Sequence, residues 1–190
     1  MSLTLAQPPA ELAALNARVD ALEAELAQLR ALVPEDRATI LVFSGDLDRL
    51  LAAFLLATGA AALGHQTTMF FSFWGVSALR VATPVPTGKA FVARLFSAML
   101  PGSAAEVGLS RLHFLGAGTA MIKRRMVERQ IADLPTLIRH ADALGVEMLA
   151  CETSMDLMGL TPEELRPGVK ITGVTTCVET AGRSRLSMVV

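Results

Sequence analysis

Strand-length apolar runs alternate with helix-length segments over most of this chain, and this order restricts the fold more than any other feature. The runs at 38–43 and 66–73 are rich in apolar, β-branched and aromatic residues, as in strands buried on both faces. A turn and a helix-length segment at 47–63 separate them. Two strands joined through a helix pair in parallel by a crossover. The sequence therefore predicts an α/β fold.

The last third of the chain returns to the same alternation. Three further strand-length runs, at 146–150, 169–174 and 186–190, are separated by short helix-length segments. With the two earlier runs they make five strands. We therefore expect residues 38–190 to form a three-layer α/β/α domain with a mainly parallel five-stranded sheet.

Residues 82–120 break this alternation. The segment at 82–100 starts with two prolines and then shows the pattern of an amphipathic helix, and glycines with mixed polarity come after it. Helices are expected again at 121–130 and 134–144. We expect 82–120 to be an irregular excursion that serves as a lid or a subunit contact.

A heptad pattern precedes the domain. Apolar residues recur at alternating steps of three and four, the spacing of a coiled-coil seam. They are Leu12, Leu15, Val19, Leu22, Leu26, Leu29 and Val33. The alternative is a helix that packs on its own domain. We expect a flexible leader at 1–9, a coiled-coil helix at 10–33 that holds a dimer or trimer, and a linker at 34–37.

Composition excludes several classes of function. The formal net charge is -1, so no global positive field is available to hold nucleic acid or an anionic membrane. The most apolar stretch, 50–79, is interrupted by polar residues at 65–68, which argues against a membrane span. The first residues lack the pattern of a secretory signal. The sequence therefore predicts a cytoplasmic protein without a membrane span.

Metal and nucleotide sites find no support in the residue spacing. The three histidines, His65, His113 and His140, are scattered, and the two cysteines have neither a CxxC nor a zinc-like spacing. The first strand–helix turn, 44–46, is too short and acidic for a phosphate loop. We expect no metal and no organic cofactor.

Cys151 is the residue best placed for chemistry. It follows the strand at 146–150 and precedes a helix, so it lies at the carboxyl edge of the predicted sheet, where ligand sites of parallel sheets occur. Amide groups at a helix start favour the thiolate, which is the reactive form. The alternative is a buried structural cysteine, because free cysteine is among the most buried residue types.

Three segments resemble the DsrE/DsrF/DrsH-like family, namely 43–48, 69–75 and 150–159, of which the Cys151-x-x-Ser154-Met155-Asp156 block is the most specific. The resemblance extends from about residue 38 to the C-terminus and leaves out the heptads. It implies a three-layer α/β/α fold, oligomers, and a sulfur carrier or sulfurtransferase that works with TusA-like carriers and rhodaneses. By this analogy Cys151 takes sulfane sulfur as a persulfide and passes it to another thiolate.

Five residues are expected to support Cys151. Ser44 and Asp46 lie in the first strand–helix turn, Trp74 follows the second strand, and Ser154 and Asp156 lie on the helix beside the cysteine. For Asp46 the alternative role is helix capping, for Asp156 a surface charge, and for Trp74 packing.

Cys177 is a candidate second thiol. It follows the next strand by three residues, and neighbouring strands are spaced closely enough to allow a disulfide if the side chains point suitably. The alternative is a spacer residue at a helix start. Two rival functions therefore stay open: a non-catalytic oligomeric scaffold with a structural Cys151, and a thiol peroxidase that uses both cysteines.

Overall fold

A computed structural model describes residues 10–81, 100–111 and 116–190. The expected leader at 1–9 and the amphipathic helix within 82–99 lie outside these residues. The chain divides into two compact units, Met1–Pro34 and Glu35–Val190.

The first unit contains one long helix, α1 (Ala10–Leu32). Six of the seven heptad residues lie on it, and all seven are between 44 and 60% exposed in the single chain. Exposed leucine in this number is unusual on a helix that has no partner. The coiled coil itself stays a prediction, because a single chain does not show what covers these side chains.

The second unit is the expected α/β domain with a five-stranded sheet in the order β4-β3-β2-β1-β5. All four strand pairs are parallel, which confirms the predicted fold class. The strands are β1 (Glu35–Val42), β2 (Gln66–Phe71), β3 (Glu147–Cys151), β4 (Lys170–Thr172) and β5 (Ser184–Val189). The helical segments are α2 (Leu47–Ala62), η1 (Phe73–Leu79), α4 (Ala117–Glu128), α5 (Leu134–Ala143), α6 (Glu152–Met158), η3 (Pro162–Glu164) and α7 (Val174–Arg183).

Strand β1 begins at Glu35, so the predicted linker at 34–37 is wrong for its last three residues. Glu35 pairs with Ser184 of β5, and Arg37 pairs with Gln66 of β2. These strand residues are polar and largely exposed, which is why they were not visible as part of an apolar run. The strand therefore extends beyond its buried portion.

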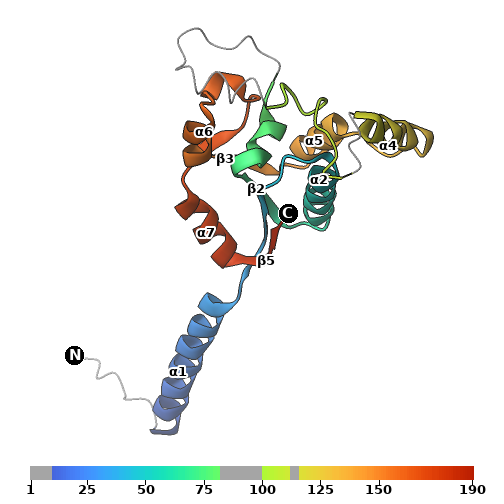
Figure 1. The fold of residues 1–190 in the computed structure, drawn as a ribbon. Coiled ribbons are helices and arrows are strands. Elements are labelled where there is room, and N and C mark those ends of the chain that lie inside the picture. Colours follow the sequence, from blue (N-terminus) through green and yellow to red (C-terminus); the bar gives the residue numbers. More distant parts are fainter. Residues whose placement is uncertain (1–9, 82–99, 112–115) are drawn as a thin grey trace. The chain divides into compact units, whose positions relative to one another are not determined.

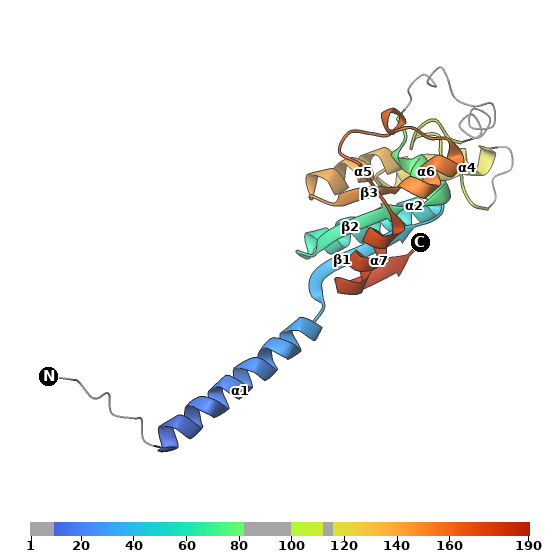
Figure 2. The same cartoon turned by 90° about the vertical axis from the view of Figure 1, so that its left-hand side faces the viewer.

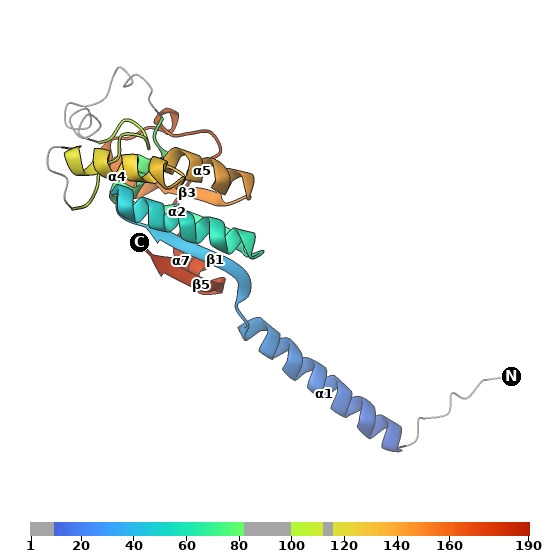
Figure 3. The same ribbon diagram turned by 90° about the vertical axis from the view of Figure 1, so that its right-hand side faces the viewer.

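Helices cover both faces of the sheet. Helices α2 and α5 pack on one face and α7 crosses the other (Figure 1). Seen from the right-hand side of Figure 1, helices α2, α5 and α4 face the reader (Figure 3). Successive strand residues point to opposite faces. Phe71 accordingly packs in the large cluster below α2 and α5, whereas Phe70 belongs to a small cluster on the α7 face.

The segment at 100–111 has turns and bends but neither helix nor strand, and helix α4 begins at Ala117, within the last residues of the predicted excursion. The first four residues of α4, 117–120, contain no large apolar side chain, so no helical period marks them in the sequence. Among the described helices, none is both long and apolar enough to cross a bilayer.

Candidate functional site

Cys151 ends β3 and is the N-cap residue of α6. The three preceding residues, Met148, Leu149 and Ala150, are almost fully buried. Their packing holds the strand in place up to the cysteine. The backbone of Cys151 is extended, with φ -72° and ψ 116°, and the helix starts at the next residue. The thiol therefore lies at the carboxyl edge of the sheet, where the sequence placed it.

A group of serine hydroxyls and backbone amides surrounds this thiol. The donors near the sulfur that lower its pKa are the Ser154 and Ser72 hydroxyls and the amides of Thr153 and Ser154. The two hydroxyl oxygens are also 3.1 Å apart, and Ser154 Oγ accepts the Phe73 N–H at 2.9 Å. The Phe73 N–H occupies one acceptor position of the Ser154 oxygen. The hydroxyl proton of Ser154 therefore stays available for donation to the cysteine or to Ser72.

These contacts decide the ionisation of Cys151. Burial raises the pKa of the thiol, because a charged sulfur loses water. The hydrogen bonds from Ser154, Ser72 and the amide of Thr153 lower it by more, so that the pKa lies below its usual range. The site therefore favours the thiolate, which is the nucleophilic form.

Cys151 is nevertheless covered in the single chain. Its exposed fraction is 4%, and it packs in a small cluster with Phe70, Leu149 and Cys177. Small reagents need only a slight opening to reach such a sulfur, whereas a protein partner needs the covering side chains to move. The thiol is therefore ionisable, and its access depends on local motion.

The backbone next to the site is strained. Phe73 has φ +44°, a left-handed conformation that a phenylalanine rarely adopts and that costs about 1–3 kcal/mol. Two contacts hold it, the hydrogen bond to Ser154 and a ring contact with Phe43 at 4.9 Å between centroids. The strained residue is thus the one whose amide donates to Ser154, beside the sulfur.

Ser44, Asp46 and Trp74 meet one another but are not among the hydrogen-bond partners of Cys151. The Ser44 hydroxyl donates to an Asp46 carboxylate oxygen at 2.8 Å, and accepts the Asp46 N–H at 3.1 Å. A Cβ at Gly45 would lie 2.6 Å from the Trp74 carbonyl oxygen, so this turn packs directly on η1. Asp46 occupies the N-cap position of α2 but makes no side-chain capping hydrogen bond.

Of the two predicted residues on α6, Ser154 contacts the thiol and Asp156 does not. Ser154 is almost fully buried, whereas Asp156 is exposed on the outer side of the helix. Cys177, the candidate second thiol, lies on α7 in the same buried cluster as Cys151. Burial and the negative charge of Cys151 raise the pKa of the Cys177 thiol.

Sequence reasoning missed Ser72 and the Phe73 amide. Residues 66–73 were interpreted as one strand, but β2 ends at Phe71 and η1 starts at Phe73. The available signal was a lone serine near the end of an apolar run, on the strand that neighbours the cysteine. Only the strand order shows that β2 pairs with β3 and that this serine therefore lies beside Cys151.

Apolar side chains are exposed beside the site. Phe43 is 46% exposed, Phe73 39% and Trp74 50%, and the first two are in contact. Clustered exposed aromatics are typical of protein interaction surfaces. This aromatic rim (Phe43, Phe73 and Trp74) adjoins Cys151 through the hydrogen bond between Phe73 and Ser154.

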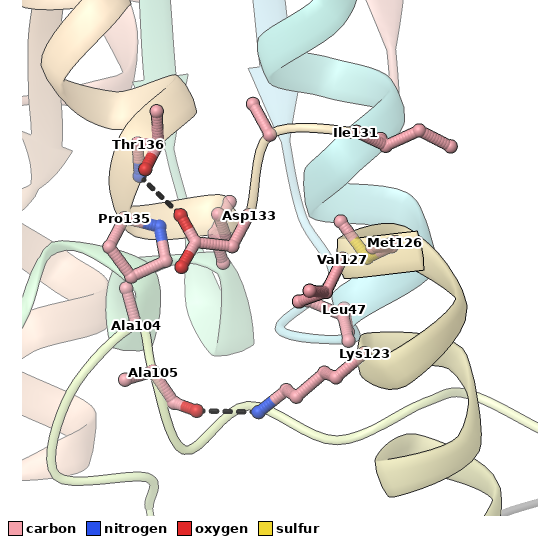
Figure 4. A pocket seen from close by; sticks show the side chains of 12 residues that line it. Leu47, Ala104, Ala105, Lys123, Met126, Val127, Ile131, Asp133, Pro135 and Thr136 are labelled. Carbon is pink, nitrogen blue, oxygen red and sulfur yellow. Dashed lines mark hydrogen bonds between the residues drawn. The ribbon is translucent and has the colours of Figure 1, made fainter. Parts of the chain in front are cut away.

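A described cavity lies away from Cys151. It has a volume of about 340 Å³ and lies between α4 and α5, with mostly apolar walls and Lys123 at one side (Figure 4). Lys123 donates to the Ala105 carbonyl oxygen at 2.6 Å, and Asp133 accepts the Thr136 N–H at 3.0 Å. Cys151 is not among its lining residues. Within the described part of the chain, no three or more His, Cys, Asp or Glu side chains gather as metal ligands.

The chain is similar to known proteins over most of its length. Residues 34–189 match the sequence model of the DsrE/DsrF/DrsH-like family. The uncharacterized protein YrkE of Bacillus subtilis (strain 168) is 40% identical over 152 residues, which are 80% of this chain and 95% of that protein. The sulfur carrier protein DsrE2 of Allochromatium vinosum is 27% identical over 166 residues, 81% of this chain and 98% of that protein.

A solved structure shows the same fold. The crystal structure of the ychN protein from E. coli has a TM-score of 0.50 and 12% sequence identity to this chain. The match covers 81% of this chain and 99% of that one. At this identity the likeness concerns the arrangement of strands and helices alone.

Proposed function

Since the chain belongs to the DsrE/DsrF/DrsH-like family, we propose that it carries sulfane sulfur as a persulfide on Cys151. One observation supports this most strongly: the serine hydroxyls and backbone amides that contact the thiol hold its pKa below the usual range in spite of burial. The relative from A. vinosum is named a sulfur carrier, which agrees with sulfur relay.

The proposed reaction is an exchange between thiolates. The Cys151 thiolate attacks the outer sulfur of a donor persulfide, the donor S–S bond breaks, and its electron pair leaves on the donor thiolate. Cys151 then carries the sulfur as Cys–S–SH, about 2 Å beyond Sγ. Delivery is the reverse step, with an acceptor thiolate as nucleophile and Cys151 as the leaving group. A low pKa favours Cys151 as a leaving group.

The surrounding residues have distinct proposed roles. Ser154 and Ser72 stabilise the thiolate, first as it attacks and later as it leaves. Trp74, with the rest of the aromatic rim, receives a partner protein that brings its own thiol. Ser44 and Asp46 fix the turn that packs on Trp74, and Asp156 remains a surface charge. No metal or organic cofactor takes part in this exchange.

The proposed partners are TusA-like or rhodanese-like carriers and further copies of this chain. The exchange is placed in the cytoplasm, because reducing conditions keep such thiols free. Copies are held by α1 through its exposed heptad residues, with further contacts through the α/β domain.

Removing residues 1–33 is expected to lower the oligomer mass measured by light scattering. An unchanged mass would assign assembly to the α/β domain alone.

Persulfide formation is tested by mass spectrometry on the full chain. After incubation with a sulfane sulfur donor, we expect an adduct of about 32 Da on the peptide that contains Cys151, removable by a thiol reductant. Cys177→Ala is the matched control and should load as well as the wild type. No adduct on the wild type, or an equal adduct on Cys151→Ala, would contradict the proposal.

A second function is favoured by the 4% exposure of Cys151: a scaffold in which the cysteine only fills the core. The two functions differ in the reactivity of the thiol. An inert core cysteine is alkylated only when the domain unfolds, whereas a carrier thiol reacts in the native protein.

A further inference from the structure

The two cysteines of the chain are brought together by neighbouring strands. Strands β3 and β4 are paired in parallel, with Cys151 level with Thr172 in the register. Helix α7 begins at Val174, only two residues after Thr172, and Cys177 is its fourth residue. The two thiols therefore belong to the same carboxyl edge of the sheet. Figure 2 shows α7 lying across one face of the sheet.

Both thiols share one small buried cluster. Its four fully buried members are Phe70, Leu149, Cys151 and Cys177, and both cysteines are free. The exposed fractions of the cysteines are 4% and 7%. Neither cysteine belongs to the large core that α2 and α5 cover. Both belong to the same small cluster.

The start of α7 contacts β4 on its inner side and is exposed to solvent on its outer side. The Thr172 and Thr176 hydroxyl oxygens are 2.7 Å apart, which fixes the first turn of the helix to the strand end. On its outer side Val174 is 58% and Val178 67% exposed. This turn is joined to the strand end at one side chain and is exposed on its outer side, so a small tilt about that contact is open to it. A disulfide requires the two Cα atoms to lie within about 4.4–6.8 Å.

We propose that Cys177 is a resolving thiol, which closes an intramolecular disulfide with Cys151 when a hydroperoxide oxidises the latter. In the first step the Cys151 thiolate attacks the peroxide, the O–O bond breaks, and Cys151 becomes a sulfenic acid while an alkoxide or hydroxide leaves. In the second step the Cys177 sulfur attacks the Cys151 sulfur, the S–O bond breaks, and water leaves with the Cys177 proton. Two molecules of an external thiol restore both cysteines.

The electrostatics of the pair suit this order of events. Hydrogen bonds lower the pKa of Cys151, so Cys151 ionises more readily than Cys177 and is the sulfur that attacks the peroxide. Burial and the Cys151 charge raise the pKa of Cys177, so it stays protonated beside the reduced site. A sulfenic acid is neutral, and the second of these two causes disappears once Cys151 is oxidised. Cys177 therefore ionises more readily at the moment when its attack is required.

The disulfide would stop sulfur exchange until it is reduced, because it occupies the sulfur that carries the persulfide. This regulatory consequence rests on the proposed function, whereas the disulfide itself does not. It would also protect Cys151, since a sulfenic acid without a resolving thiol proceeds to a sulfinic acid that thiols do not reduce.

The experiment treats the reduced full chain with hydrogen peroxide and follows intact mass, free thiols and digests. For the wild type we expect a species about 2 Da lighter, with residues 151 and 177 in one linked peptide and both thiols lost together. A thiol reductant should restore both thiols and the capacity to take up sulfane sulfur.

Cys177→Ala should give no linked peptide, and peroxide should convert its Cys151 to a sulfinic acid that the reductant leaves unchanged. This adduct adds about 32 Da, as a persulfide does, and the reductant distinguishes the two. Cys177→Ser is run in parallel, with urea unfolding as the check on folding.

The inference is overturned if Cys177 in the wild type stays free while Cys151 is over-oxidised, or if the linked peptides come from two chains. Failure of the proposed function would look different. In that case the reduced protein takes up no sulfane sulfur, while the disulfide between residues 151 and 177 still forms.

Discussion

Replacing Glu164 with glutamine is expected to lower the free energy of unfolding of the α/β domain by about 3–5 kcal/mol, the usual cost of breaking a buried ion pair by removing the charge of one partner. Arg80 and Glu164 form an ion pair at 3.1 Å, and their side chains are only 6% and 2% exposed. Because water does not reach this pair, the remaining guanidinium would not be solvated in its place.

The pair also connects three segments of the chain. Glu164 accepts the Thr161 N–H at 2.9 Å, which holds η3, and Arg80 donates to the carbonyl oxygens of Leu100 and Pro101 at 3.3 and 3.0 Å. A glutamine at residue 164 keeps the shape but not the charge, and its single amide oxygen can accept from Arg80 or from the Thr161 N–H, not from both. The loss therefore reports on the ion pair rather than on packing.

Urea unfolding measures this effect, with Glu163→Gln as the control. Glu163 is the adjacent residue of η3 and is solvent-exposed, so its neutralisation should move the unfolding midpoint far less than Glu164→Gln. The double variant Arg80→Met, Glu164→Leu should recover part of the lost stability, because an apolar pair has no charge to desolvate. A loss below about 1 kcal/mol in Glu164→Gln would show that the pair is not buried in solution.

Ser154→Ala is expected to slow the reaction of Cys151 with alkylating reagents about tenfold at neutral pH, which corresponds to a rise of about one unit in the pKa of the thiol. The hydroxyl of Ser154 lowers this pKa by donating to the sulfur. Without it, burial still disfavours the charge, and the Ser72 hydroxyl and the amides remain as the only donors described at the site.

The direction of the pH dependence follows from the same contacts. A thiol whose pKa is depressed becomes the thiolate at a lower pH, so the rate of a wild-type chain levels off earlier as the pH rises. Ser154→Ala should shift this profile to higher pH and leave the rate at high pH unchanged. Ser187→Ala, a serine-to-alanine change on β5, is the control. A profile that does not move in Ser154→Ala would remove the serine from the account.

The order of strands and helices was predictable because the buried portions of β1, β2 and β3 are continuous apolar runs. The polar start of β1 was not, since only its pairing with β2 and β5 shows that residues 35–37 belong to a strand. The start of α4 lacked a helical period for a similar reason. Hydrophobic patterning reports burial, and secondary structure that is not buried leaves little signal.

The position of Cys151 was predictable from its place between a strand and a helix, but its environment was not. Ser72 and Ser154 are 82 residues apart, and only the pairing of β2 with β3 brings them to one sulfur. The left-handed conformation of Phe73 has no sequence signal, because phenylalanine rarely adopts it and is not a residue type that favours it. The pair of Arg80 and Glu164 is likewise a product of long-range packing.

The central claim is that the Cys151 sulfur of the native chain is both ionised and within reach of another molecule. It is tested by the rate of Cys151 alkylation by iodoacetamide as a function of pH. The measurement uses the folded Cys177→Ala variant, in which Cys151 is the single thiol that can react. We predict a reaction in the native state whose midpoint lies at a lower pH than that of the same chain unfolded in urea. A Cys151 that reacts only upon unfolding, or with a midpoint above that of the unfolded chain, would contradict the account.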